Sequence, residues 1–261
     1  MSKPQLTTLR LEHEADEAVA TLILNRPDHL NALSIDLLRE IPIACRWLDE
    51  TVAIKAVVVR GAGRAFSAGF DLNDFTTIDE TASPTTTADL GRLATEALTD
   101  VRPITVAAVH GHCVGGALLI AAACDLRLAS DDARFSIPEV DLGIPLAWGG
   151  IPRLVREVGP AVTKELVLTC RPFGADEALG LHFLNRVVPG ADLVAAADDL
   201  AAELASKPRF SLVATKTQVN AIMDEIAGVG RNANDAHTLA SALRDPESRA
   251  ASQAYLTSRN K

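Results

Sequence analysis

The chain has 261 residues, of which 48% are hydrophobic and 23% are charged, and its formal net charge is −9 at pH 7. This composition is typical of a globular protein of one or two domains, and the acidic balance argues against nucleic acid and anionic membranes as partners. No uncharged run is long enough to span a bilayer, and the first residues lack the apolar core of a signal peptide. We therefore expect a cytoplasmic protein.

The first third of the chain alternates short apolar strands with helices. Residues 19–25 have high β propensity and are expected to form a strand, which ends at a turn signalled by Arg26 and Pro27. Ser34 is a suitable cap for a helix over 35–50, although Pro42 is expected to kink or divide it. A second, valine-rich strand follows at 53–61.

The middle of the chain continues the pattern. The Thr-, Ser- and acid-rich segment 76–91 predicts an exposed loop, and a helix is expected at 92–100. A buried strand (104–111), a helix (116–124) and two further strands (125–130 and 133–137) come next. Strands that alternate with helices favour an α/β fold with much parallel pairing.

The character of the chain changes near residue 192, where Ala-rich, helix-periodic segments begin and strand-like runs stop. We therefore divide the chain into an α/β core over residues 1–191, which holds the predicted site, and a helical region over 192–261. The helical region is expected to cap the core or to form an oligomer contact.

Neither the cysteines nor the histidines form a convincing metal site. The cysteines show no CxxC spacing and lie mostly in apolar surroundings, so we expect them to be reduced and buried. The pair His110 and His112 has no evident third ligand, and no metal is expected. The cysteines are Cys45, Cys113, Cys124 and Cys170.

Two segments combine a buried strand with a turn of small residues. They are "GAGRAFSAGFDL" (61–72) and "HCVGGALLI" (112–120). The first lacks the third glycine of a dinucleotide fingerprint and the Gly-Lys-Ser/Thr of a P-loop, so it is better read as a loop that exposes backbone amides. Two such loops can direct two N–H groups at one oxygen, as in an oxyanion hole.

A third segment, "FSIPEVDLGIPLAWGG" (135–150), offers carboxyl groups in an apolar neighbourhood. Pro138 fixes the chain before Glu139, and Asp141 follows two residues later. Burial disfavours the charged form of a carboxyl, and a carboxyl with a raised pKa suits proton transfer. The alternative is a purely structural role, in which Glu139 is a loop acid paired with a backbone amide or an arginine.

With these segments the chain resembles the crotonase superfamily, the enoyl-CoA hydratase/isomerase group. The matching stretches follow in register: "LNRPDHLNALS" (24–34), "GAGRAFSAGFDL", "AAVHGHCVGGALLIAAACDLRLAS" (107–130), "ARFSIPEVDLGIP" with "WGGIPRL" (148–154), and "ADEALGLHFLNRVVP" (175–189). The resemblance implies a spiral of ββα units with a C-terminal helical trimerisation region. It also implies assembly as a homotrimer or a dimer of trimers.

The resemblance further implies a coenzyme A thioester as substrate, with no other cofactor. Its carbonyl oxygen would be held by the backbone amides of Ala68 and Gly116. The stretch Arg64–Phe70 would line the coenzyme A path, and Arg26 would approach a phosphate. The residues expected to contact substrate are thus Arg26, Arg64, Ala65, Phe66, Ala68, Phe70, Gly115 and Trp148.

One acid of the family pattern is missing here. Family hydratases use two glutamates, and the first falls at Leu119 while the second is Glu139. Dienoyl isomerases of the family would place acids at Leu119 and near Ala147. A lone glutamate resembles the family members that move a 3-enoyl double bond to position 2, and we expect that reaction. Hydration assisted by Asp141 or His112, and acyl-CoA binding without turnover, remain alternatives.

Overall fold

A six-stranded sheet forms the centre of the fold. In the computed structural model, which describes residues 2–76, 84–228 and 234–259, six strands form this sheet in the order β1-β2-β3-β4-β6-β9. β1 is antiparallel to β2, and each later neighbour is parallel. The strands are β1 (Leu9–Glu12), β2 (Val19–Leu24), β3 (Ala56–Gly61), β4 (Ile104–Val109), β6 (Leu126–Ser130) and β9 (Arg186–Val188).

A second, three-stranded sheet lies beyond the first. β5 (His112–Val114) pairs in parallel with β7 (Arg134–Ser136), and β7 pairs antiparallel with β8 (Phe173–Gly174). Two of the predicted segments therefore meet, because β5 precedes the glycine pair and β7 precedes Glu139.

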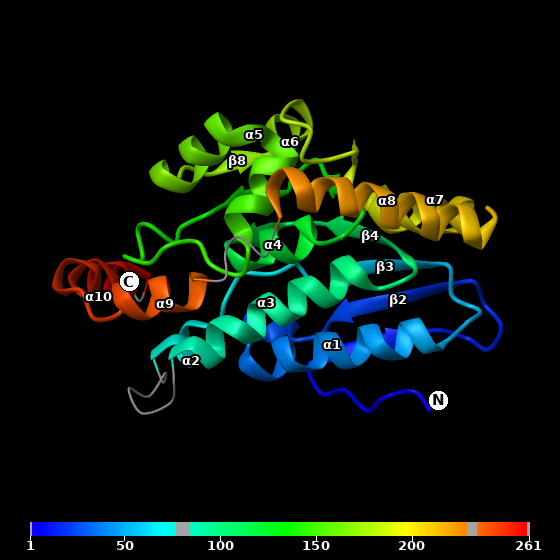
Figure 1. Cartoon of the computed structure of the whole chain (residues 1–261), viewed down its shortest axis with the longest axis horizontal. Helices are drawn as coiled ribbons and strands as arrows, with labels where there is room; N and C mark the ends of the chain where they lie inside the picture. The colour runs from blue at the N-terminus through cyan, green and yellow to red at the C-terminus, as the bar shows by residue number, and fades with distance from the viewer. Residues whose placement is uncertain (1, 77–83, 229–233, 260–261) are drawn as a thin grey trace.

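Helices cover both faces of the central sheet (Figure 1). Alternate residues of parallel strands point to opposite faces, so Val57 and Val59 pack toward α1 (Ile35–Glu50), α3 (Pro84–Asp100) and α4 (Gly116–Ala122). Val58 and Val106 pack on the other face, against α7 (Leu193–Ala205). The first long helix of the C-terminal region thus belongs to the core.

The remaining helices surround this core. α9 and α10 lie at the same end of the molecule as α2 (Figure 1). No helix within the described ranges is long and apolar enough to cross a membrane. The bounds are η1 (Pro27–His29), α2 (Leu72–Thr76), α5 (Gly150–Thr169), α6 (Ala175–Gly180), η2 (Gly190–Asp192), α8 (Arg209–Ala227), α9 (Asp235–Ala242) and α10 (Pro246–Arg259).

The predicted strands and most predicted helices are confirmed, with two corrections. Pro42 does not divide α1, which is continuous and capped by Ser34. Its buried face includes Leu38, Ile41 and Cys45, and burying three such side chains outweighs the ~3 kcal/mol that an interior proline costs. The predicted loop over 76–91 is wrong from Pro84, where α3 begins, and residues 77–83 lie outside the described ranges. All four cysteines are free and buried, as expected.

Candidate active site

The loop after β3 runs beside β5, and backbone hydrogen bonds hold the two together. The Phe66 amide donates to the His110 carbonyl at 2.7 Å, and the Ser67 amide donates to the His112 carbonyl at 2.9 Å. Gly69 has φ +91°, and a Cβ there would lie 2.6 Å from the Val114 carbonyl oxygen. Only glycine allows this backbone approach, so Gly69 brings the loop against the turn that holds the glycine pair.

The backbone amides of this loop are not equivalent. The Ala68 amide donates to the Leu30 carbonyl at 2.9 Å. The prediction that this amide is available to a substrate oxygen is therefore wrong. The Phe70 amide, two residues later, and the Gly116 amide donate to no acceptor within the described part of the chain. Because Phe70 and Gly116 line the same cavity, they are the pair that could bind one oxygen.

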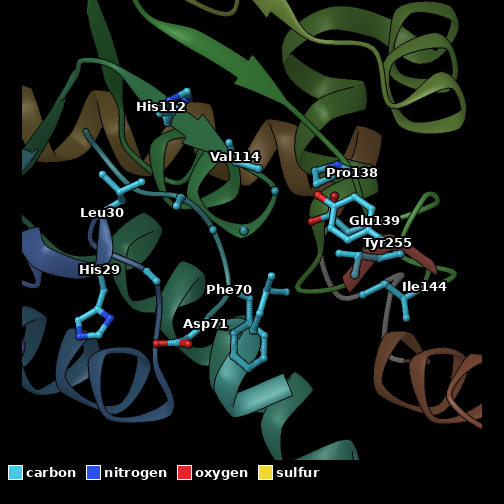
Figure 2. Close-up of a pocket in the computed structure, with 17 residues that line it drawn as sticks. His29, Leu30, Phe70, Asp71, His112, Val114, Pro138, Glu139, Ile144 and Tyr255 are labelled. Carbon is cyan, nitrogen blue, oxygen red and sulfur yellow. The ribbon is translucent and has the colours of Figure 1, made fainter. Parts of the chain in front are cut away.

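The cavity between these loops has a volume of about 360 Å³. Figure 2 shows Pro138, Glu139, Ile144 and Tyr255 on one side of it and His29 and Leu30 on the other. The residues that line it come from five parts of the chain: His29, Leu30, Ala32, Ala68, Gly69, Phe70, Asp71, Leu72, His112, Val114, Gly115, Gly116, Pro138, Glu139, Leu142, Ile144 and Tyr255.

Glu139 brings to the cavity a carboxyl group whose pKa suits proton transfer near neutral pH. Burial raises the pKa of this carboxyl from 4.5 to about 7, and an interaction with its own backbone amide opposes the shift in part. Its Oε2 atom is buried and has no hydrogen-bond partner among the described residues. A buried polar atom without a partner costs free energy, so such an atom at a cavity indicates a functional site. The alternative of a loop acid satisfied by an amide or an arginine does not account for Oε2.

Gly115 places this carboxyl next to the glycine turn. A Cβ on Gly115 would lie 2.5 Å from Glu139 Oε1, and the residue has φ +53°. The Gly115 amide donates to the Ser136 carbonyl at 2.9 Å, which ties the turn to the strand that leads to Glu139. The proton-transfer group and the Gly116 amide therefore lie on neighbouring backbone segments.

Asp71 also lines the cavity, but it is held in an ion pair. Arg26 Nη1 lies 2.8 Å from Asp71 Oδ2 and also donates to the Ala32 carbonyl. Burial alone would raise the pKa of Asp71, but the hydrogen bonds from Arg26 and from the Asn73 amide outweigh it and lower the pKa. The prediction that Arg26 approaches a phosphate gains no support, since its guanidinium is bound to Asp71 and to the Ala32 carbonyl.

Other predicted contacts fall into two groups. Ala65 and Phe66 are fully buried in the core, so their side chains are not available to a ligand and that prediction is wrong. Arg64 is exposed and does not line the cavity. Trp148 also lies off the cavity wall, where its ring packs behind Gly116.

Of the four positions considered for a second acid, only that of His112 lines the cavity. Asp141 is exposed and is absent from the cavity lining. Leu119 is 1% exposed and packs toward Gly150, where a Cβ would meet Leu119 Cδ1 at 2.9 Å. Ala147 is buried in the core. His112 does line the cavity, which leaves it as the remaining titratable candidate of that set.

Sequence reasoning missed several lining residues. Tyr255 comes from α10, and Leu142 and Ile144 come from the loop after Glu139. α10 is fastened to that loop, because Ser252 Oγ donates to the Leu142 carbonyl at 2.5 Å. No local sequence pattern predicts this contact. The available signal is that Tyr255 is the single tyrosine of the chain.

Comparisons with known proteins show which family the chain belongs to. The family model for enoyl-CoA hydratase/isomerase matches residues 14–261. The chain is 38% identical over 190 residues, 68% of either protein, to the peroxisomal Delta(3,5)-Delta(2,4)-dienoyl-CoA isomerase of Arabidopsis thaliana. It is 35% identical over 217 residues to a short-chain-enoyl-CoA hydratase of Clostridium acetobutylicum, covering 83% of this chain and 82% of that one.

Solved structures agree with the same assignment. An enoyl-CoA hydratase/carnithine racemase from Magnetospirillum magneticum superposes with a TM-score of 0.80 at 30% identity, covering 85% of this chain and 83% of the other. An enoyl-CoA hydratase/isomerase from Mycobacterium paratuberculosis gives a TM-score of 0.88 at 26% identity, covering 96% and 99%. The chain has the crotonase fold and belongs to the enoyl-CoA hydratase/isomerase family of enzymes.

Proposed function

We propose that this enzyme moves the double bond of a 3-enoyl-CoA to position 2. The observation that carries the proposal is the carboxyl of Glu139, whose Oε2 has no partner among the described residues, beside two unused backbone amides. The other carboxyl of the cavity, Asp71, is paired with Arg26, and position 119 carries a leucine. Moving a double bond needs one proton to leave and one to return, and a single group on one face can do both.

The proposed reaction proceeds through an enolate. The Glu139 carboxylate takes a proton from C2 of the 3-enoyl thioester, and the electrons move toward the thioester oxygen. The amides of Phe70 and Gly116 donate to that oxygen and stabilise the negative charge. The protonated Glu139 then returns the proton at C4, which leaves the 2-enoyl thioester. The sum is an isomerisation that uses no cofactor beyond the coenzyme A of the substrate.

Hydration is the second candidate, because the similar proteins include enzymes named as enoyl-CoA hydratases. Adding water to a 2-enoyl thioester requires a held water molecule and a proton donor. Glu139 could activate the water, and His112 would then have to act as the second group from the same cavity. The absence of a carboxyl at Leu119 makes this arrangement less suited to hydration than to isomerisation.

The decisive experiment supplies the purified protein with 3-enoyl-CoA and with 2-enoyl-CoA of several chain lengths. We expect conversion of the 3-enoyl to the 2-enoyl thioester, and a kcat/KM that rises with pH through about 7, because Glu139 must be deprotonated to act as a base. Chromatography of the acyl-CoA products over pH 5–9 measures both. Fast formation of 3-hydroxyacyl-CoA with no isomerisation would instead establish the hydratase.

We also propose that the protein forms a homo-oligomer, a trimer or a dimer of trimers, through α8. Val219, Ile222 and Ile226 recur on one face of that helix and are 53%, 56% and 64% exposed. An apolar stripe of this kind is typical of a surface covered in an assembly. Light scattering should give a mass above that of one chain, and Ile222→Glu should reduce it. A monomeric wild-type protein would contradict this proposal.

A further inference from the structure

Trp148 adopts a backbone conformation that its side chain does not favour. Its φ is +61°, and the next residue, Gly149, has φ +68°. Positive φ is uncommon for a bulky residue and costs free energy, so the surrounding structure must hold it in place. Two hydrogen bonds hold this backbone: Thr95 Oγ1 donates to the Trp148 carbonyl at 3.3 Å, and the Gly149 amide donates to Asp235 Oδ2 at 2.9 Å.

This conformation inserts the indole between two glycines on different helices. A Cβ on Gly116, the first residue of α4, would lie 2.4 Å from Trp148 Cζ3. A Cβ on Gly91, inside α3, would lie 1.9 Å from Cε2 and 2.0 Å from Cδ2 of the same ring. Both positions are therefore filled by the indole, and neither tolerates a side chain while the ring stays where it is.

The same ring also contacts the other half of the proposed oxyanion hole. The rings of Trp148 and Phe70 meet edge to face, with centroids 6.0 Å apart and an interplanar angle of 87°. Such pairs are directional, so one ring constrains the other. Trp148 thus touches the two residues whose amides remain unused, although it does not line the cavity itself.

We propose that Trp148 is a positioning residue that sets the separation of the Phe70 and Gly116 amides and thereby tunes binding of the thioester oxygen. The inference rests on the proposed function, since it assumes that these amides hold a thioester oxygen. Trp148 acts through the two amide-bearing residues and does not touch the reacting atoms. Gly91 contributes to this positioning, because the absence of a side chain at residue 91 makes room for the indole.

The test uses Gly91→Ala, a change in α3 that removes no functional group. Alanine favours a helix by about 1 kcal/mol over glycine, so the helix itself should not suffer. In the wild-type background the new methyl group must displace the indole, and we expect kcat to fall about tenfold with a smaller change in KM. In a Trp148→Ala background the same substitution meets no ring and should cost almost nothing further.

Gly180→Ala is the matched control, because Gly180 ends a helix and a Cβ there would have nothing within 4 Å. It should leave kcat unchanged. Where Trp148→Ala does not fold, Trp148→Phe replaces it as the second background, and it should partly relieve the effect of Gly91→Ala. An equal loss of kcat on Gly91→Ala in both backgrounds would overturn the proposal.

A binding measurement separates this inference from the proposed reaction. Butyryl-CoA has a thioester carbonyl but no double bond to move, and S-butyl-CoA, a thioether, lacks the carbonyl oxygen. We expect calorimetry to show a preference of up to about tenfold for the thioester, the worth of one or two hydrogen bonds. Gly91→Ala should reduce that preference while leaving S-butyl-CoA binding unchanged. A preference that Gly91→Ala leaves intact refutes the positioning role, whereas a lost preference without any isomerisation in the wild type refutes only the reaction.

Discussion

Replacing Glu139 with glutamine should lower kcat for 3-enoyl-CoA isomerisation by about 10²–10⁴, the usual contribution of a general base. The amide side chain keeps the size of the carboxyl but cannot accept the C2 proton. Binding of butyryl-CoA should persist, because the Phe70 and Gly116 amides are unaffected. Steady-state kinetics and calorimetry on the same preparation measure the two quantities. Asp141→Asn is the control: this carboxyl is exposed and off the cavity wall, so its loss should leave kcat unchanged.

The stability of the glutamine variant gives an independent check on the state of Glu139. The folded-state pKa of about 7 lies above the ordinary 4.5, so between these pH values the folded protein holds a proton that the unfolded chain has released. Stability is therefore lost as pH rises from 4.5 to 7. With allowance for solvent screening, Glu139→Gln should raise the free energy of unfolding by about 2 kcal/mol at pH 8 and hardly at pH 5. A variant that is less stable than the wild type at pH 8 would contradict the buried, unpartnered carboxyl.

Phe70→Pro should reduce kcat by about 10²–10³, because it deletes one of the two amides that we propose as donors to the enolate oxygen. The Phe70 amide has no acceptor among the described residues, so its removal breaks no internal hydrogen bond. Phe70→Ala is the matched control, since it removes the ring but keeps the N–H. The proline variant should show the larger loss in kcat at a similar far-UV circular dichroism spectrum.

Equal kcat values for Phe70→Pro and Phe70→Ala would remove the Phe70 amide from the reaction. The comparison also distinguishes the two effects at this position, because the ring contacts Trp148 whereas the amide is the proposed donor to the substrate oxygen. A loss shared by both variants would be the effect of the ring. An additional loss in the proline variant is the effect of the donor.

The sequence supported the order of elements well, because strands buried on both faces and capped helices have strong local patterns. The strand 104–111, the helix from Gly116 and the capped helix after Ser34 all appear close to their expected bounds. The start of α3 was missed because its first turn, "PTTTAD", is rich in residues that also favour loops. Pro42 does not divide α1, because the tertiary burial of that helix outweighs the local penalty of a proline.

The sequence predicted which segments line the candidate site, but it did not predict which single backbone amides are free of internal hydrogen bonds. Glu139 and Gly116 lie on the cavity as expected, but the choice between Ala68 and Phe70 depends on backbone direction. Gly69, with φ +91°, breaks the regular alternation between them, and whether an amide is internally bonded depends on Leu30 across the loop. A one-dimensional pattern carries neither fact. The contribution of Tyr255 is likewise long-range, since α10 reaches the loop only in the folded chain.

The contact between α10 and the loop after Glu139 affects the order in which parts of the protein can fold during synthesis. Ser252, which holds the Leu142 carbonyl, lies 110 residues further along the chain than that carbonyl, and the backbone of Ser248 packs where Gly143 would carry a Cβ. During synthesis the sheets and α4 can form well before these residues leave the ribosome. The loop that bears Glu139 gains its final support only afterwards. A nascent chain can therefore have a folded core while the loop that carries Glu139, the proposed base, still lacks its final contacts.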